Sequence, residues 1–350
     1  MKAISIGKRL VGADYPPFLV AEISANHNQS FERAAALVHA AKAAGADAVK
    51  LQTYTAETLT MDSSNPEFLI KDPGSLWNGK RLYDLYSQAS TPWEWHQPLQ
   101  ELCSKEGLIF FSTPFDETAV EFLAELHVPC FKIASHEITH LPLIRKAASY
   151  RKPLIISTGM ATLDEIGAAV KTAETGGCEE IILLKCTSEY PASSKNSHLR
   201  TLQNLEKIFN KPVGLSDHTL GVGAALASIA LGGCVVEKHL ALSRKEGGVD
   251  AAFSMEPEEF KLLAVEAKEV WQSLGSIHYG PLPEEKTSYS HRRSIYFNKD
   301  LKPGDRLTAE NIKIIRPSNG LPPSEYDKIL GRQVAKEVKR GTPVSWDLLK

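Results

Sequence analysis

The sequence predicts an α/β fold, namely a (β/α)8 (TIM) barrel followed by a small β-rich domain. Two observations predict the barrel. Eight short apolar runs alternate with longer helical patterns, and together they span about 260 residues, the usual size of a closed barrel. A third observation predicts the second domain, because the long helical patterns stop after residue 276 and short strand-like runs follow.

The eight predicted strands are short runs of apolar and β-branched residues. Continuous apolar runs that are each followed by a helix are typical of a parallel sheet covered by helices. The runs are residues 18–24, 48–54, 108–114, 130–135, 154–158, 181–187, 213–216 and 235–240. A doubly wound open sheet is the competing topology, but it would normally show a Gly-rich phosphate turn after its first strand, and none is present.

Several predicted helices have recognisable ends. Glycine is favoured just after a helix, and it follows the patterns at 31–44, 92–106, 162–175 and 256–274. Ser30, Thr91, Thr162 and Ser254 are the N-caps expected from their side chains. A helix of small residues at 222–233 separates the last two strands.

The C-terminal part differs in texture. Residues 277–290 contain Pro281, Pro283 and a charged Glu-Glu-Lys stretch, which predicts a linker between a domain at 1–276 and another at 291–350. Strand-like runs follow at 294–298, 306–308, 312–316 and 334–338. A module of about 60 residues has little core of its own, so we expect it to pack against another protein surface.

The composition indicates which classes of partner and which cellular compartment to expect. The 40 Lys and Arg nearly balance 42 Asp and Glu, so nothing indicates a nucleic-acid or membrane partner. The five cysteines form no Cys-x-x-Cys pair, which favours free thiols in a reducing compartment. The N-terminus lacks the apolar segment of a signal peptide, so we expect a cytoplasmic protein.

Every predicted strand ends in polar residues. In a barrel of this type the active site forms at the C-terminal ends of the strands. Chemically useful side chains at these ends are Glu22, Lys50, Gln52, Thr113, Lys132, Ser135, Glu137, Ser157, Ser188, Tyr190, Ser216, His218, Glu237 and His239. Eight such strand ends together indicate a catalytic site.

Two of these residues, Lys50 and Lys132, lie inside apolar strands, where an unpaired ammonium is costly. With the hydroxyls of Thr113, Ser135, Ser157 and Ser216 they would form an anion cradle, suited to a small phosphate that carries a carboxylate. The alternative is a structural pair with Glu22 or Glu137. Glu22 is also a candidate general base or hydroxyl anchor.

His218 and His239 end the last two strands and would project from the same end of the sheet. Neutral imidazoles are common ligands of Mn²⁺, Mg²⁺ or Zn²⁺ acting as a Lewis acid. Glu237 could orient the site or bind through water. The alternative is two unrelated, hydrogen-bonded histidines at strand ends.

The motifs resemble the sialic acid synthase (N-acetylneuraminate synthase-like) family over essentially the whole chain. They are residues 21–28 (AEISANHN), 49–52 (VKLQ), 112–116 (STPFD), 131–135 (FKIAS), 156–160 (ISTGM), 215–219 (LSDHT) and 237–239 (EKH). The C-terminal part looks like the antifreeze-like (SAF) domain of that family. Residues 82–86, 91–96 and 316–323 are most similar to its pseudaminic acid synthase branch.

The resemblance implies a metal-dependent condensation of phosphoenolpyruvate with an open-chain amino sugar and water, which releases phosphate by C–O cleavage. The implied phosphoenolpyruvate residues are Lys50, Gln52, Thr113, Lys132, Ser135, Ser157, Ser188 and Ser216. His218 and His239 would bind Mn²⁺ or Mg²⁺. Glu22, Asn78, Tyr190, Asp250 and Arg316 would contact the sugar, and the implied catalytic residues are Glu22, Lys50, Lys132, Glu137, Tyr190 and Asp250.

The resemblance also implies a homodimer in which the SAF domain caps the partner's barrel and Arg316 reaches the sugar in trans. Ser188 stands where N-acetylneuraminate enzymes of the family carry Asn. The long segment at 55–90 is expected to line the sugar pocket, since long loops at a barrel mouth often act as lids. A surface-packed excursion is the alternative.

Three other functions compete with the implied branch. A synthase of N-acetylneuraminate, legionaminate or spore-coat polysaccharide would use N-acetylmannosamine or a related amino sugar. A Schiff-base aldolase would use Lys132 or Lys50 as its nucleophile. A non-catalytic carbohydrate-binding protein would use the SAF-like module as its working part.

Overall fold

The first unit of the chain is a closed barrel of eight parallel strands, as predicted. The computed structural model describes residues 2–350, which divide into two compact units, one ending at Gly275 and the other comprising Ser276–Lys350. The barrel strands follow one another in chain order around the ring, and the last closes onto the first. They are β3 (Phe18–Glu22), β4 (Ala48–Thr53), β5 (Ile109–Pro114), β6 (Phe131–Ile133), β7 (Leu154–Ser157), β8 (Ile181–Cys186), β9 (Val213–Asp217) and β10 (Val235–His239).

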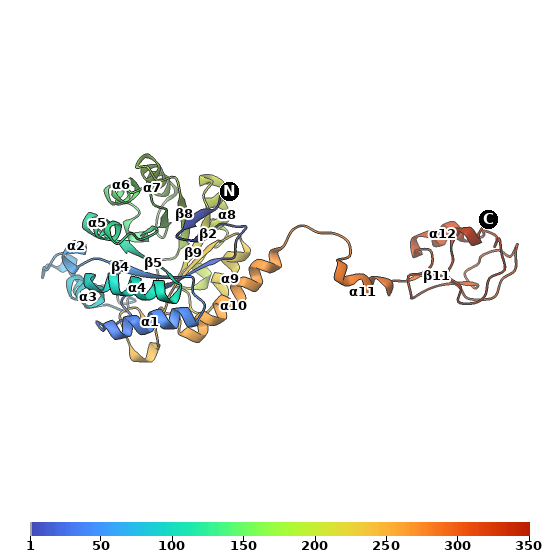
Figure 1. Cartoon of the computed structure of the whole chain (residues 1–350), viewed down its shortest axis with the longest axis horizontal. Coiled ribbons are helices and arrows are strands. Elements are labelled where there is room, and N and C mark those ends of the chain that lie inside the picture. The colour runs from blue at the N-terminus through green and yellow to red at the C-terminus, as the bar shows by residue number, and fades with distance from the viewer. Residues whose placement is uncertain (1) are drawn as a thin grey trace. The chain divides into compact units, whose positions relative to one another are not determined.

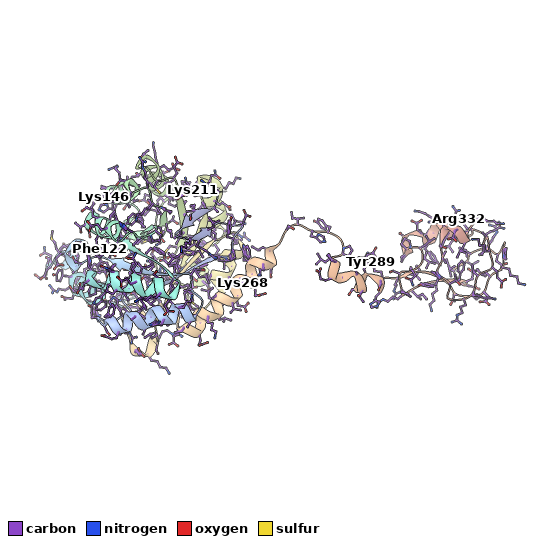
Figure 2. All side chains as sticks on the ribbon, in the orientation of Figure 1. Phe122, Lys146, Lys211, Lys268, Tyr289 and Arg332 are labelled. Carbon is purple, nitrogen blue, oxygen red and sulfur yellow. The ribbon has the colours of Figure 1, made fainter. Side chains whose placement is uncertain are left out.

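The helices surround these strands (Figure 1). The main ones are α1 (Phe31–Ala43), α4 (His96–Glu106), α5 (Glu117–Glu125), α6 (Leu141–Ser149), α7 (Leu163–Thr175), α8 (Thr201–Phe209), α9 (Gly223–Ala230) and α10 (Pro257–Leu274). Their apolar faces and the strands form one hydrophobic core. Charged side chains such as Lys146, Lys211 and Lys268 lie on the outside of this ring (Figure 2).

A hairpin that the sequence did not predict precedes the barrel. It pairs β1 (Ile4–Ile6) antiparallel to β2 (Arg9–Val11). Its inward residues Ile6 and Val11 are fully buried in the core. Three-residue strands carry too little periodicity to be recognised from sequence.

Two of the four predicted N-caps are confirmed and two are wrong. Ser30 caps α1, and Thr162 forms a capping box with Glu165 at α7. Thr91 precedes a 3-10 turn at Trp93–Trp95, and its hydroxyl instead lies 3.1 Å from His27 Nε2. Ser254 bonds Asn26 and the Asp250 carbonyl, while Glu256 caps α10.

Gly214 in β9 allows the barrel to close tightly. A Cβ at this position would lie 2.8 Å from Leu184 Cδ2 on β8 and 2.9 Å from Val235 Cβ on β10. Real Cβ atoms do not approach that closely, so only glycine fits between these two strands. The strand that carries His218 at its end is thereby held against both neighbours.

The second unit has its own small core and fewer strands than predicted. Only β11 (Ser294–Phe297) and β12 (Ile312–Ile315) form a two-stranded antiparallel sheet. The predicted strands at 306–308 and 334–338 contribute isolated bridges, such as Arg306 to Gln333 and Leu301 to Val338. Frequent Pro and Gly turns interrupt these runs before a regular ladder forms. The core contains Ile295, Phe297, Leu301, Leu307, Ile312, Ile329, Val334, Val338 and Val344.

Three further short α-helices lie outside the predicted linker. They are α2 (Ala56–Leu59), α3 (Leu82–Ala89) and α12 (Tyr326–Ile329). The predicted linker is not entirely irregular, because it contains the five-residue helix α11 (Lys286–Ser290). Among residues 2–350, no helix combines the length and the apolar composition needed to cross a membrane.

Candidate active site

Strand register brings the predicted site residues to one level of the barrel. Glu22 on β3 lies beside Lys50 on β4 and, on its other side, beside His239 on β10. Ser216 on β9 lies beside Glu237 on β10 in the same way. Alternate residues of a strand point to opposite faces. Glu237 and His239 therefore point inward, while Lys238 between them points outward and bonds the Asp217 carboxylate at 3.0 Å.

A deep polar pocket opens at this end of the barrel. Nine of its lining residues are predicted ligands of the anion or the metal. Its lining comprises Lys50, Gln52, Thr113, Phe115, Lys132, Ala134, Ser135, His136, Ser157, Cys186, Tyr190, Ser216, His218, Glu237 and His239. Ser188 is not part of this lining, but its hydroxyl lies 3.8 Å from the sulfur of Cys186. Apart from Ser188, the residues predicted to bind the anion thus lie together around one pocket.

The two lysines are paired with buried carboxylates. Lys50 Nζ is paired with Glu22, lies 3.4 Å from Glu237 Oε1 and donates to Thr113 Oγ1 at 3.1 Å. Lys132 Nζ lies 3.6 Å from Glu237 Oε2. The alternative in which the lysines pair with Glu22 or Glu137 applies to Lys50, which pairs with Glu22, whereas the carboxylate near Lys132 is Glu237.

Burial and pairing set the pKa values of these groups. Burial would lower the pKa of the Lys50 ammonium, but Glu22 and Glu237 outweigh it and raise that pKa. Burial lowers the pKa of Lys132, and Glu237 offsets only part of this. Burial would raise the pKa of Glu237, yet the two lysines lower it. Each lysine nitrogen therefore faces a buried glutamate at the bottom of the pocket.

One hydroxyl of the cradle lacks a partner. Ser157 is buried, and its Oγ makes no hydrogen bond within the protein. Buried polar atoms in native proteins are nearly always bonded to protein, water or ligand. Ser157 lines the same pocket as Lys132, so its hydroxyl is available to a bound anion.

Ser135 is positioned by the backbone of Gly159. The Gly159 N–H donates to Ser135 Oγ at 3.0 Å, and a Cβ on Gly159 would lie only 2.7 Å from that oxygen. We predict that Gly159→Ala raises the KM for the anionic substrate about tenfold or more, since a hydrogen bond to a charged group contributes about 1.5–3 kcal/mol. Steady-state kinetics would measure this. Gly167→Ala, on the outer helix α7, is the control, and equal effects of the two substitutions would contradict the prediction.

The two histidines fit a metal ion. Their ring centroids are 5.4 Å apart, and both line the pocket. His218 Nδ1 lies 3.0 Å from the Thr187 carbonyl, which can only accept, so Nδ1 carries a proton and the neutral ring would have its lone pair on Nε2. Buried His239 Nδ1 makes no hydrogen bond. Among residues 2–350, no cluster of three or more His, Cys, Asp or Glu forms a complete ligand set, so water or substrate would supply the remaining ligands.

A wider vestibule adjoins the deep pocket. The two cavities share Gln52, Phe115, Ala134, His136, Tyr190 and His239. Many of the remaining vestibule residues are apolar, including Leu59, Ile70, Leu82, Leu85, Ala89 and Phe253, and Glu137 and Asp250 also line it. The segment at 55–90 supplies much of this wall. The segment at 55–90 was expected to line a pocket at the barrel mouth, and it does line the vestibule.

Among the predicted sugar contacts, Tyr190 and Asp250 line the vestibule, and Glu22 lies beneath it in the Lys50 pair. The Tyr190 ring packs against His218 with a centroid separation of 4.6 Å. Asp250 Oδ2 lies 3.4 Å from His239 Nδ1. Asn78 is exposed and lines neither cavity, whereas its neighbour Trp77 does line the vestibule. Arg316 follows β12 in the second unit.

Family models match both parts of the chain. The NeuB family matches residues 37–279, and the SAF domain matches residues 292–350. The chain belongs to the NeuB family. It is thus an enzyme of the phosphoenolpyruvate-condensing nonulosonate synthase family, with a C-terminal SAF domain, as the motifs predicted.

Relatives of this NeuB-family chain act on different sugars. The pseudaminic acid synthase of Helicobacter pylori is 42% identical over 335 residues, covering 95% of this chain and 97% of that protein. The N,N′-diacetyllegionaminic acid synthase of Legionella pneumophila is 36% identical, covering 96% and 95%. A crystal structure of N-acetylneuraminic acid synthetase from Leptospira borgpetersenii, in complex with citrate, has a TM-score of 0.73 at 30% identity, covering 82% and 95%.

Several residues of the NeuB-family site were missed as contributors. Cys186 was not among the predicted site residues, yet it lines the pocket with its sulfur 3.8 Å from His218 Nδ1. Phe253 packs against the His239 ring at 4.9 Å. His136 lines both cavities. The strand-end position of Cys186 could have revealed its role, but no sequence signal indicated Phe253.

Glu137 predicts a pH-dependent stability. Burial raises its pKa to about 7, against 4.5 when exposed, and Lys132 offsets only part of this. A raised pKa stabilises the fold fully below pH 4.5, and this stabilisation is lost as the pH rises through 7. We predict that the unfolding free energy of the wild type relative to Glu137→Gln falls by at most about 3 kcal/mol between pH 4.5 and 8. Urea denaturation of both proteins without substrate measures this, and a pH-independent difference would contradict it.

Proposed function

We propose that the chain is a pseudaminic acid synthase. It condenses phosphoenolpyruvate with the open-chain aldehyde of 2,4-diacetamido-2,4,6-trideoxy-β-L-altropyranose, and water, to give pseudaminate and phosphate. The main support is a polar pocket with two lysines and several serine and threonine hydroxyls, which adjoins a largely apolar vestibule. The similarity to pseudaminic acid synthases of Helicobacter and Campylobacter supports the choice of sugar.

The pocket residues suit a phosphoenolpyruvate site. Lys50 and Lys132 would pair with its phosphate and carboxylate, and Thr113, Ser135, Ser157 and Ser216 would donate hydrogen bonds. Gln52 also lines this pocket, and Ser188 lies behind Cys186. Binding there would hold C3 of phosphoenolpyruvate toward the vestibule, in which the aldehyde is bound.

The reaction forms one C–C bond and breaks one C–O bond. C3 of phosphoenolpyruvate attacks the aldehyde carbon, whose oxygen becomes a hydroxyl. Water adds at C2, and the bond from C2 to the phosphate oxygen breaks, so phosphate leaves with that oxygen. A divalent ion at His218 and His239, either Mn²⁺ or Mg²⁺, would polarise the aldehyde as a Lewis acid when bound. Glu22, Tyr190 and Asp250 would position the sugar and the attacking water, and Glu137, which lines the vestibule, would support the site.

The vestibule favours a sugar with an apolar end. The methyl group of a 6-deoxy sugar would bury apolar surface against Leu59, Leu82 and Leu85, whereas a C6 hydroxyl would meet no polar partner among these three side chains. Phosphate release should therefore be measured with phosphoenolpyruvate, Mn²⁺ and a panel of amino sugars, before and after chelation. Exclusive turnover of N-acetylmannosamine would reject the proposal and favour an N-acetylneuraminate synthase, and exclusive turnover of the legionaminate precursor would favour that enzyme.

A Schiff-base aldolase remains a distinct chemical alternative, because burial lowers the pKa of the Lys132 amine and so favours a nucleophile. Such an enzyme would work without metal. Borohydride with pyruvate should trap a covalent adduct on an aldolase and none on the proposed synthase. An adduct on Lys132, together with activity that survives chelation, would replace our proposal.

We further propose a homodimer in which Arg316 completes the sugar site of the partner barrel. Arg316→Ala is expected to lower kcat/KM for the sugar about 10- to 100-fold, as expected for a lost charged hydrogen bond. Mixing inactive His218→Ala with Arg316→Ala subunits tests the geometry. If Arg316 acts in trans, each heterodimer should regain one near-normal site, in the barrel that keeps His218 and receives Arg316 from the other subunit. Activity that never exceeds the Arg316→Ala level would place Arg316 in cis.

A further inference from the structure

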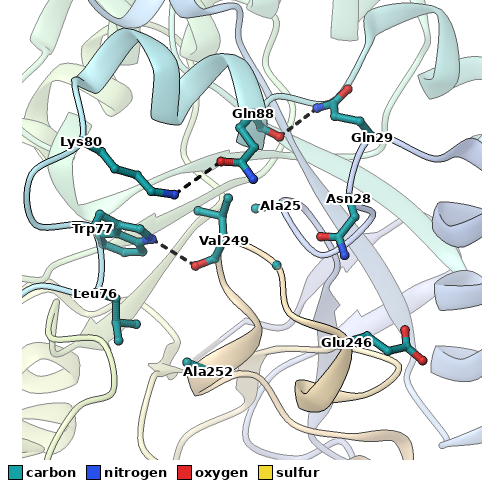
Figure 3. A pocket seen from close by; sticks show the side chains of 11 residues that line it. Ala25, Asn28, Gln29, Leu76, Trp77, Lys80, Gln88, Glu246, Val249 and Ala252 are labelled. Atoms are coloured by element: carbon teal, nitrogen blue, oxygen red, sulfur yellow. Dashed lines mark hydrogen bonds between the residues drawn. The ribbon is translucent and has the colours of Figure 1, made fainter.

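An outer cavity of about 610 Å³ lies next to the vestibule, which measures about 470 Å³. Only Ala25, Trp77 and Val249 line both of them. Figure 3 shows the outer cavity with Trp77 at its edge and Gln88, Gln29 and Asn28 across it. No residue of the outer cavity belongs to the deep pocket, so the phosphoenolpyruvate site lies apart from it.

Trp77 has the largest side chain among the three residues that line both cavities. Ala25 has a single methyl group and Val249 a short side chain, so Trp77 is the one large side chain that they share. Its Nε1–H donates to the Val249 carbonyl at 3.1 Å, a bond that joins the 55–90 segment to the loop after β10 (Figure 3). Its ring also packs on Tyr190 at a centroid distance of 5.8 Å. These two contacts fix the position of the indole where the two cavities meet.

The outer cavity offers room and polar groups beyond this wall. Lys80 Nζ lies 3.5 Å from Gln88 Oε1, and Gln29 Nε2 donates to the Gln88 carbonyl at 3.0 Å. These bonds fix the far side of the cavity without filling it. A substituent that passes Trp77 would meet amide groups there and the side chain of Leu76.

We propose that Trp77 determines substrate size: it limits the N-acyl groups of the amino sugar to about the size of acetyl by separating the vestibule from the outer cavity. The proposal rests on the proposed function, in which the vestibule holds an acylamino sugar. An acyl group directed toward Ala25 and Val249 meets the indole. Without the indole, the same group extends into the outer cavity.

The test compares acetyl and butanoyl forms of whichever amino sugar the panel shows to be turned over, with butanoyl placed at each amino position in turn. The measured quantity is the ratio of kcat/KM for the butanoyl and acetyl forms, which does not depend on the fraction of folded enzyme. For Trp77→Ala we expect this ratio to rise about tenfold at one position, the effect of accommodating two more methylenes. Trp77→Leu should give a smaller rise, and Trp77→Phe little change, because most of the ring remains.

Trp271→Phe is the matched control. Trp271 on α10 likewise donates its indole N–H to a backbone carbonyl, that of Ala13 at 3.1 Å, but it lines none of the three cavities. Its ratio should equal that of the wild type. An unchanged ratio in both Trp77→Ala and Trp77→Leu, or a wild type that uses both forms equally, would overturn this inference alone. Failure to turn over any amino sugar would overturn the proposed function as well.

Discussion

Replacing Lys132 by Met is expected to lower kcat/KM for phosphoenolpyruvate by about 10²- to 10⁴-fold. Truncating one member of a buried, hydrogen-bonded charge pair costs about 2–5 kcal/mol. Lys132 is almost fully buried, and its ammonium lies in the pocket 3.6 Å from Glu237. Met keeps most of the side-chain volume while removing the charge, so the decrease in kcat/KM measures the contribution of that charge to binding the anion. Steady-state kinetics with phosphoenolpyruvate as the varied substrate measure it.

The fold should survive this substitution, because Glu237 keeps Lys50 as a partner at 3.4 Å. Lys152→Met is the matched control. Burial lowers the pKa of Lys152 as well. Lys152 lies just before β7 and does not line the pocket, and its Nζ donates to the Val128 carbonyl at 2.6 Å. Similar losses for the two variants, or a loss below fivefold for Lys132→Met, would remove Lys132 from the anion site.

The sequence predicted the barrel because each strand and helix carried a strong local signal. The apolar runs, the helical periods and the glycines after helices agreed with one another, and agreement between levels is what specifies a fold. The hairpin β1–β2 and the irregular second unit were harder to predict. Their strands are short, and their pairing depends on turns and isolated bridges rather than on periodicity.

The candidate site was predictable where a residue's position on a strand determined its direction. Lys50, Thr113, His218 and His239 follow from strand ends alone, because parallel strands point their carboxyl ends at one face. The pairing of Lys132 was not predictable in this way. Whether Glu137 or Glu237 reaches an ammonium depends on side-chain distances across the barrel, which sequence spacing does not encode. For the same reason Asn78 was chosen instead of its neighbour Trp77, since orientation within a long segment has no simple period.

Replacing His218 or His239 by Ala should abolish most metal-dependent activity, with a loss of about 10³-fold or more, because Lewis-acid stabilisation contributes several kcal/mol. Either substitution would remove one of the two proposed protein ligands of the metal. The buried charges give a further reason. Lys50 and Lys132 each face a buried glutamate, so a bound cation would add positive charge that favours phosphoenolpyruvate. Chelation should accordingly raise the KM for phosphoenolpyruvate as well as lower kcat.

Metal binding separates this prediction from a general loss of folding. Titration calorimetry with Mn²⁺ alone, in the absence of both substrates, should give heat of binding for the wild type and little for either His→Ala variant. His96→Gln is the control, because His96 is equally buried but bonds Thr53 Oγ1 at 2.8 Å outside the pocket lining, so Mn²⁺ binding should persist. If His218→Ala and His239→Ala still bound Mn²⁺ like the wild type, the two histidines would be hydrogen-bonded strand-end residues. The cation would then have to bind elsewhere.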